Sequence, residues 1–314
     1  MTMRRMILLL LCLCMAAVLF SGCNGPRPSL TGKIVVTNFA VYDWILQILG
    51  ENPAGLEVVY LLDSGVDLHS FQPTADHIMQ VQTASLFYYV SDWSETWVSG
   101  ALKTTKSEGV AITDIVKDDL LCQDGHDHTH EEEHHHTYDE HIWTSLKLAQ
   151  KVCQWIFGDI AGLDPENREV YLQNYEAYVA KLAELDGKYE KAVAEGTRDT
   201  VLFADRFPFL YLFSDYGIKY ASAFSGCSTE SDASFETITR LAGVVDEKEL
   251  KSVMTIEGSR GNVASAVIGA TQKKDAKILS VNSMQTVTKQ DMEKGITYLG
   301  LMEENLFAVQ EALK

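Results

Sequence analysis

Short apolar runs alternate with longer amphipathic stretches along most of the chain. Runs rich in Val, Ile, Leu, Phe and Tyr predict buried strands, and apolar residues spaced three and four positions apart predict helices. Strands that alternate with helices favour a mostly parallel sheet covered by helices on both faces. The predicted strands are 33–37, 56–61, 85–90, 110–115, 199–203, 219–224, 252–256 and 277–281. The predicted helices are 40–49, 143–157, 207–216, 234–244 and 262–273.

The strongest helical pattern runs from Glu166 to about Glu195. Asp164 and Pro165, which precede it, suit an N-cap and a first helical turn. A helix of this length would span about 45 Å. We therefore predict an α/β fold with two lobes, each a mostly parallel sheet flanked by helices, joined by a long rigid backbone helix. The predicted division is an N-terminal lobe at 33–163, a connecting helix at 164–196 and a C-terminal lobe at 197–314.

The N-terminus has the pattern of a secretory signal. Two arginines precede an apolar run, and small residues follow that run directly before Cys23. The run is shorter than the ~20 residues that span a bilayer. Ser-Gly before Cys23 resembles the bacterial lipoprotein box, in which the cysteine carries lipid. We predict a signal peptide at 1–22 and a lipidated tether at 23–32, which would anchor an extracytoplasmic protein to the cell membrane. An ordinary cleaved signal with an incidental cysteine is the alternative.

Charge and cysteine content narrow the class of protein. The formal net charge is −18, which argues against a nucleic-acid partner, because phosphates require a basic face. Acidity is mildly favourable for cations, although it usually serves solubility. Beyond Cys23, the mature chain would hold Cys122, Cys153 and Cys227. An odd number in an oxidising compartment leaves at least one cysteine free, metal-bound or paired with another chain.

Most of the histidines fall in one acidic segment, 124–138. Neutral imidazole is the commonest transition-metal ligand among side chains. A polar run of this kind does not build a rigid site, but it can hold several weak, exchanging sites that raise the local metal concentration. The alternative is a solvated loop of biased composition. The histidines of this predicted metal-capture loop are His126, His128, His130, His134, His135 and His136.

Two further histidines share one local setting. His69 in DLHSF and His141 in DEHIW each follow an aspartate by two positions and precede an aromatic residue by two. A lone histidine is more often structural than ligating, but two matched settings beside a His-rich segment point to a metal site. His77 lies on the helix predicted after Pro73, where we expect it to be exposed or satisfied locally.

These segments resemble a known family. DLHSFQP is similar to the G-x-D-P-H-x-[YF]-E-P segment, and DEHIWTSLKLA to the D-P-H-[IVF]-W-L-[SD]-P-x-N-A segment, of the zinc- and manganese-binding solute-binding lipoproteins of ABC uptake systems (cluster A-I). The His-rich loop is typical of the zinc-uptake branch. The resemblance implies a metal between two lobes, His69 and His141 as the first two ligands, and delivery to an ABC permease and its ATPase by a monomer.

The resemblance leaves the rest of the coordination shell open. The family's third ligand position falls on Ala204 and its last on Asn282. Substitutes should lie at strand ends, where open α/β sheets bind ligands. These candidates are Asp205, Cys227, Glu230 and Glu257. Three of them have an ordinary alternative: an ion pair with Arg206 or a helix cap for Asp205, a small filler or free thiol for Cys227, and a hinge or a salt bridge between lobes for Glu257.

A metal and a function follow from these residues. A thiolate would hold the preference at zinc, whereas carboxylates alone would shift it towards manganese. We expect Zn²⁺, with Mn²⁺ as the alternative, and a binding protein for an importer that is not an enzyme. Two other hypotheses are a surface adhesin or metal buffer without transport, and a secreted zinc hydrolase. The hydrolase has no supporting GxSxG motif and no evident paired general base.

Overall fold

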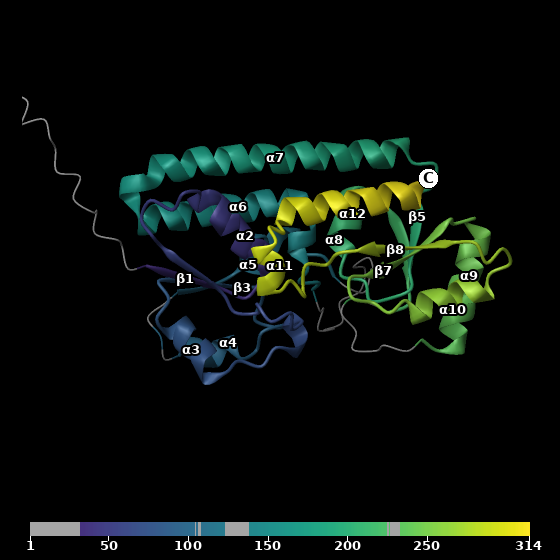
Figure 1. Ribbon diagram of the computed structural model, residues 1–314, viewed down its shortest axis with the longest axis horizontal. Helices are drawn as coiled ribbons and strands as arrows, with labels where there is room; N and C mark the ends of the chain where they lie inside the picture. Colours follow the sequence, from purple (N-terminus) through teal and green to yellow (C-terminus); the bar gives the residue numbers. More distant parts are fainter. Residues whose placement is uncertain (1–31, 104, 106–107, 123–137, 225, 227–232) are drawn as a thin grey trace, which may run out of the picture. The chain divides into compact units, whose positions relative to one another are not determined.

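Two parallel four-stranded sheets carry the fold, and each is built from a different half of the chain (Figure 1). The first has strand order β2-β1-β3-β4 and the second β6-β5-β7-β8, so both follow the same plan. We call the parts built around these sheets the first and second lobes. The strands are β1 (Lys33–Val36), β2 (Glu57–Tyr60), β3 (Leu86–Tyr89), β4 (Glu108–Ala111), β5 (Thr200–Phe203), β6 (Lys219–Ser222), β7 (Ser252–Ile256) and β8 (Lys277–Val281).

The computed structural model describes residues 32–103, 105, 108–122, 138–224, 226 and 233–314. All of these residues belong to one compact unit. Within this part of the chain, no helix is both long and apolar enough to cross a bilayer. The predicted signal peptide, Cys23, the six loop histidines, Cys227 and Glu230 lie outside it.

Helices flank both sheets, which confirms the predicted fold class. Single 3-10 turns join several of them: η1 (Leu68–Ser70), η2 (Lys117–Asp119), η3 (Ile142–Thr144) and η4 (Pro165–Asn167). The α-helices of the first lobe are α2 (Phe39–Leu49), α3 (Ala75–Gln82), α4 (Val98–Leu102), α5 (Ile112–Ile115) and α6 (Leu146–Leu163). The long helix is α7 (Arg168–Glu195). Those after it are α8 (Leu210–Asp215), α9 (Phe235–Glu247), α10 (Asn262–Ala270), α11 (Lys289–Glu293) and α12 (Tyr298–Leu313).

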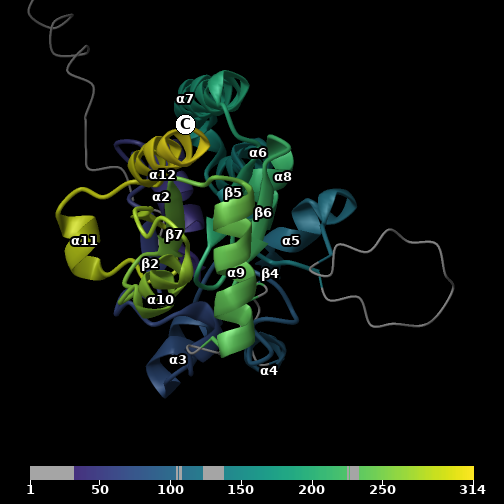
Figure 2. The same ribbon diagram turned by 90° about the vertical axis from the view of Figure 1, so that its right-hand side faces the viewer.

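The long helix α7 contacts helices from both halves of the chain. It packs against α2 and α6 of the first lobe and against α12, which follows β8, and Figures 1 and 2 show α7 and α12 side by side. The buried face of α7 carries tyrosines and leucines at helical spacing, and the hydroxyl of Tyr189 donates to the carbonyl of Met302 at 2.7 Å. Its 28 residues correspond to about 42 Å. The predicted backbone helix is therefore confirmed.

Two of the sequence predictions need correction, and one helix was missed. The predicted strand 110–115 ends at Ala111, because Thr113 turns its backbone N–H and hydroxyl to the carbonyl of Val90, and Ile112–Ile115 becomes α5. The predicted helix 207–216 begins only at Leu210, since Phe207 pairs with Gly226 and Pro208 follows. The C-terminal helix α12 was not predicted, although its apolar residues recur at helical spacing.

A buried carboxylate ties three helices together. Asp43 on α2 is 5 % exposed. Its Oδ2 accepts the backbone N–H of Tyr298 on α12 at 3.2 Å and the hydroxyl of Tyr178 on α7 at 3.3 Å. Burial raises the pKa of Asp43 to about 6, against these two stabilising hydrogen bonds. The contact between the lobes therefore includes an acid that keeps its proton in mildly acidic solution.

We expect Asp43→Asn to flatten the pH dependence of stability in the metal-free protein. The folded pKa lies above the unfolded one, so the contribution of Asp43 is complete below about pH 4 and is lost as pH rises through about 6. The shift corresponds to roughly 3 kcal/mol. Urea unfolding between pH 4 and 7 should show the parent losing about that much relative to the variant. An exposed control, Asp118→Asn, should keep the slope of the parent; an unchanged slope in Asp43→Asn would contradict the assignment.

Candidate metal centre

Two histidines and one glutamate gather beyond the carboxyl ends of the first sheet. Ligand atoms of His69, Glu140 and His141 all lie within 4.8 Å of one another. Glu140 Oε1 is 3.2 Å from His69 Nε2 and 4.0 Å from His141 Nε2. Ligand atoms around a tetrahedral zinc ion stand about 3.3 Å apart. The cluster thus has the separation that a metal ion needs, and small side-chain shifts would close it.

The turn that carries His69 is held by an aspartate. Asp67 precedes η1, in the segment that follows β2, and its Oδ1 accepts the backbone N–H of His69 at 3.0 Å. Its Oδ2 accepts from the guanidinium of Arg206 at 3.1 Å. Leu68, 5 % exposed, anchors the same turn in the core. The side chain of His69 is 23 % exposed, although its Nε2, the atom that faces Glu140, is covered.

His141 is held in the same way but more deeply. It lies directly before η3, and Asp139 Oδ1 is 2.9 Å from both its backbone N and its ring Nδ1. In the tautomer that donates from Nδ1 to this carboxylate, Nε2 keeps its lone pair, and Nε2 lies 4.0 Å from Glu140 Oε1. His141 is 0 % exposed. A carboxylate that orients an imidazole in this way is the usual support of a metal-binding histidine.

Sequence reasoning missed Glu140. Its side chain is buried between the two imidazoles, although a buried carboxylate is costly without a cation or a hydrogen-bond partner. One sequence signal was available: Glu140 stands where the family segment has proline, directly between Asp139 and His141. The structure brings this substituted position into contact with His69, which lies about seventy positions earlier in the chain.

A second carboxylate was also missed. Glu95, which follows β3, is 1 % exposed, and its Oε2 accepts the backbone N–H of Val90 at 2.5 Å. Burial raises the pKa of Glu95 to about 7, and the charge of the nearby His69 opposes that rise. Glu95 is not one of the three clustered ligands. It is instead a buried carboxyl group with a raised pKa that lies near His69.

The carboxylates predicted from the second lobe lie outside the cluster. Asp205 Oδ1 accepts the backbone N–H of Arg206 at 2.9 Å. Glu257 accepts from the backbone N–H and the hydroxyl of Ser283, at 2.7 and 2.6 Å, and so holds the loop after β8. Burial raises the pKa of Glu257, and these hydrogen bonds oppose the rise. In the described structure both groups support backbone turns.

The two vacated family positions have structural roles. Ala204 is 2 % exposed and packs in a small core with residues of α9 and α10. Asn282 caps a turn, since its side-chain oxygen accepts the backbone N–H of Met284 at 2.8 Å.

His77 caps α3, where its Nδ1 accepts the backbone N–H of Thr74 at 3.2 Å, which confirms that it is satisfied locally. Cys153 is buried in α6, and burial raises the pKa of its thiol.

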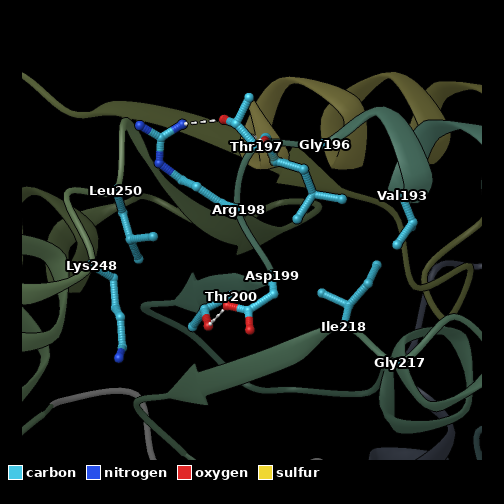
Figure 3. Close-up of a pocket in the computed structure, with 11 residues that line it drawn as sticks. Val193, Gly196, Thr197, Arg198, Asp199, Thr200, Gly217, Ile218, Lys248 and Leu250 are labelled. Carbon is cyan, nitrogen blue, oxygen red and sulfur yellow. Dashed lines mark hydrogen bonds between the residues drawn. The ribbon is translucent and has the colours of Figure 1, made fainter.

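A cavity of about 420 Å³ lies elsewhere, at the start of β5 (Figure 3). Arg198, Asp199 and Lys248 are among the residues that line it. Asp199 pairs with Lys219 at 2.7 Å. Among its described lining residues there is no histidine, cysteine or glutamate, so this cavity does not compete with the histidine cluster as a metal site.

Comparisons with known proteins identify relatives of this chain. The zinc-binding lipoprotein AdcA of Streptococcus pneumoniae is 30% identical over 318 residues, which cover 98% of this chain and 61% of AdcA. The high-affinity zinc uptake system protein ZnuA of Bacillus subtilis is 29% identical over 286 residues, covering 89% of this chain and 87% of ZnuA. The chain thus spans under two thirds of the length of AdcA.

Solved structures show the same fold. The metal-dependent lipoprotein YcdH of Bacillus subtilis superposes with a TM-score of 0.75 at 27% identity, covering 90% of this chain and 100% of that one. The Zn(II)-bound ZnuA-like domain of Streptococcus pneumoniae AdcA gives 0.71 at 25% identity, with 90% and 99% covered. A family model described as "Zinc-uptake complex component A periplasmic" (ZnuA) matches residues 34–312. The resemblance to the metal-binding solute-binding lipoproteins is therefore confirmed, and the chain belongs to the ZnuA family.

Proposed function

We propose that this protein captures a zinc ion in the histidine cluster and delivers it to an ABC importer. The observation that carries the proposal is the cluster itself, in which a buried, aspartate-oriented His141 faces Glu140 and His69. Two imidazoles and a carboxylate form a ligand set that zinc takes readily. The relatives AdcA and ZnuA are named for zinc binding and zinc uptake, which supports the same cargo here.

The proposed ligand atoms are Nε2 of His69, Nε2 of His141 and Oε1 of Glu140. A water molecule would take the fourth position of the tetrahedron. Asp205, Glu257 and Cys227 stay predictions as ligands, because the clustered ligand atoms of the described residues come from His69, Glu140 and His141. A ligand set that includes two nitrogen donors favours Zn²⁺ over Mn²⁺.

The cellular setting is part of the proposal. Removal of the signal peptide at 1–22 would leave Cys23 lipidated and the protein tethered outside the cell membrane. An ABC permease and its ATPase would receive the metal from a monomer of this protein. The His-rich loop would collect metal and pass it to the cluster. The acidic surface, with a formal net charge of −18, suits a protein that attracts cations.

The hydrolase hypothesis keeps one sequence match. Residues 130–134 read HEEEH, which has the H-E-x-x-H spacing of zinc metalloproteases. That spacing is catalytic only on a helix that presents both histidines on one face, and these residues lie outside the described part of the chain. The described cluster is built from other residues, and the family is one of metal-uptake components.

Replacing either clustered histidine should abolish tight zinc binding. His69→Ala and His141→Ala each remove one of three protein ligands, so we expect a loss of at least about 100-fold in affinity, or roughly 2.8 kcal/mol. Competition with a chromophoric chelator measures this loss. The matched control is His77→Ala, which removes an imidazole that caps α3 and should bind zinc like the parent. Parental affinity in both cluster variants would overturn the site.

Glu140→Gln tests the ligand that sequence reasoning missed. The amide keeps the size of the side chain but donates less strongly to a metal, so affinity should fall about 10- to 100-fold, in the range seen when a metal site loses one supporting group. Glu176→Gln, an exposed substitution on α7, is the control. Asp205→Asn serves as the competing arm: a larger loss there than in Glu140→Gln would move the third ligand to the second lobe.

Deleting 124–137 should separate metal capture from the central site. Cys122 and Tyr138 pair in an antiparallel bridge, so a short Gly-Ser link can replace the loop without moving the segment at 139–141. We expect zinc affinity of the cluster within about twofold of the parent, a lower total zinc stoichiometry in native mass spectrometry, and slower loading in stopped flow. A loss of affinity as large as that of His141→Ala would show that the loop supplies ligands.

A further inference from the structure

Both histidine turns are contacted by one segment of the second lobe. This segment, 204–211, follows β5 and includes the position where the family places its third ligand. Arg206 contacts the turn that holds His69, and Tyr211 contacts the turn that holds His141. Ala204, in the same segment, is packed in the core and offers no ligand atom. The segment thus meets the site through hydrogen bonds to the turns that carry the ligands.

Arg206 reaches the first turn through a shared carboxylate. Its guanidinium donates to Asp67 Oδ2 at 3.1 Å, while Asp67 Oδ1 accepts the backbone N–H of His69 at 3.0 Å. The side chains of Arg206 and Asp67 are 28 % and 14 % exposed, so the pair is partly shielded from water. Charge-assisted hydrogen bonds of this kind are stronger than neutral ones. Movement of Arg206 would therefore shift the turn on which His69 sits.

Tyr211 reaches the second turn at the base of the predicted metal-capture loop. Its hydroxyl donates to the carbonyl of Asp139 at 2.6 Å and accepts the backbone N–H of Leu121 at 3.1 Å. The backbone N–H of Asp139 in turn donates to the carbonyl of Leu121 at 2.8 Å. Tyr211 is 2 % exposed, and burial raises the pKa of its hydroxyl, which keeps the proton that it donates. Asp139 is the residue that orients His141.

We propose that Arg206 and Tyr211 are positioning residues that fix the two metal-binding histidines from the opposite lobe. We call this pair the lobe clamp. The proposal rests on the proposed function, because the histidines must bind the metal for their positions to matter. At the position where the family places its third ligand, this chain has Ala204. The second lobe instead contributes the hydrogen bonds that position the two histidines. Metal affinity then depends on contact between the lobes through Arg206 and Tyr211, independently of the prediction that Asp205 is a ligand.

The lobes have other contacts that hold them together when the clamp is removed. The indole N–H of Trp143 donates to the carbonyl of Ser283 at 2.8 Å. The hydroxyl of Ser145 donates to Asp215 at 2.6 Å. These bonds, together with the packing of α7, should keep clamp variants folded. An effect on metal binding can therefore be separated from an effect on folding.

The test compares Arg206→Gln, Tyr211→Phe and the double variant with the parent. Chelator competition should show about a 10-fold loss of zinc affinity for each single variant and a larger loss for the double variant. With Co²⁺ in place of zinc, the visible ligand-field spectrum should change in band position, because the histidines no longer hold one geometry. Arg206→Lys, which keeps the charge but not the planar fork, should recover part of the affinity.

The matched control is Tyr216→Phe, which removes the hydroxyl that donates to Asp186 at 2.7 Å, away from both histidine turns. Its zinc affinity should equal that of the parent, and the metal-free melting temperature of the clamp variants should match that of this control. Parental affinity and Co²⁺ spectrum in the double variant would overturn the clamp. The clamp would also be overturned if the clamp variants lost zinc affinity and lost metal-free stability by the same free energy. His141→Ala with parental affinity would instead overturn the proposed function itself.

Discussion

The arrangement of the two lobes depends on one buried acid and the helix beside it. Asp43 receives hydrogen bonds from α7 and α12, and α7 packs along helices of both halves. These contacts join helices from both halves of the chain, so they help to hold the two sheets in one arrangement. The histidine cluster, the loop after β8 and the segment after β5 all lie at the carboxyl edges of these sheets. A buried acid is a costly way to make such a contact, and the raised pKa of Asp43 measures that cost.

Each of the two histidine turns is fixed by an aspartate two positions before the histidine. In each, that aspartate accepts the backbone N–H of the histidine, and it also makes one hydrogen bond to the second lobe. The turns differ in depth: Asp139 also orients the ring of His141, whereas Asp67 turns its second oxygen to Arg206. The same aspartate–histidine turn therefore has two different additional roles. In the His141 turn the aspartate orients the imidazole, and in the His69 turn it contacts the other lobe through Arg206.

The sequence predicted the parts of this protein that depend on periodicity. Most of the strands and the long helix have clear periodic patterns, so their positions were predicted to within a few residues. The segment at 110–115 was misassigned because its β-branched residues favour a strand, while the carbonyl of Val90 captures Thr113 and bends the chain. His69 and His141 were found because their settings match. Glu140 and Glu95 were not, since nothing in a linear sequence says which carboxylate will be buried against which imidazole.

The uneven burial of the two histidines has a kinetic consequence. His141 is sealed from solvent at 0 % exposure, while the side chain of His69 remains 23 % exposed. Nε2 of His69 is itself covered, so an incoming ligand would reach an ion bound between the two imidazoles only after the ring of His69 moves. Exchange at the proposed site would then be ordered, and the bond to His69 would be the first to break and the last to form. The inner pair, His141 and Glu140, would set the affinity for the ion. His69 would set the rate at which the ion is exchanged.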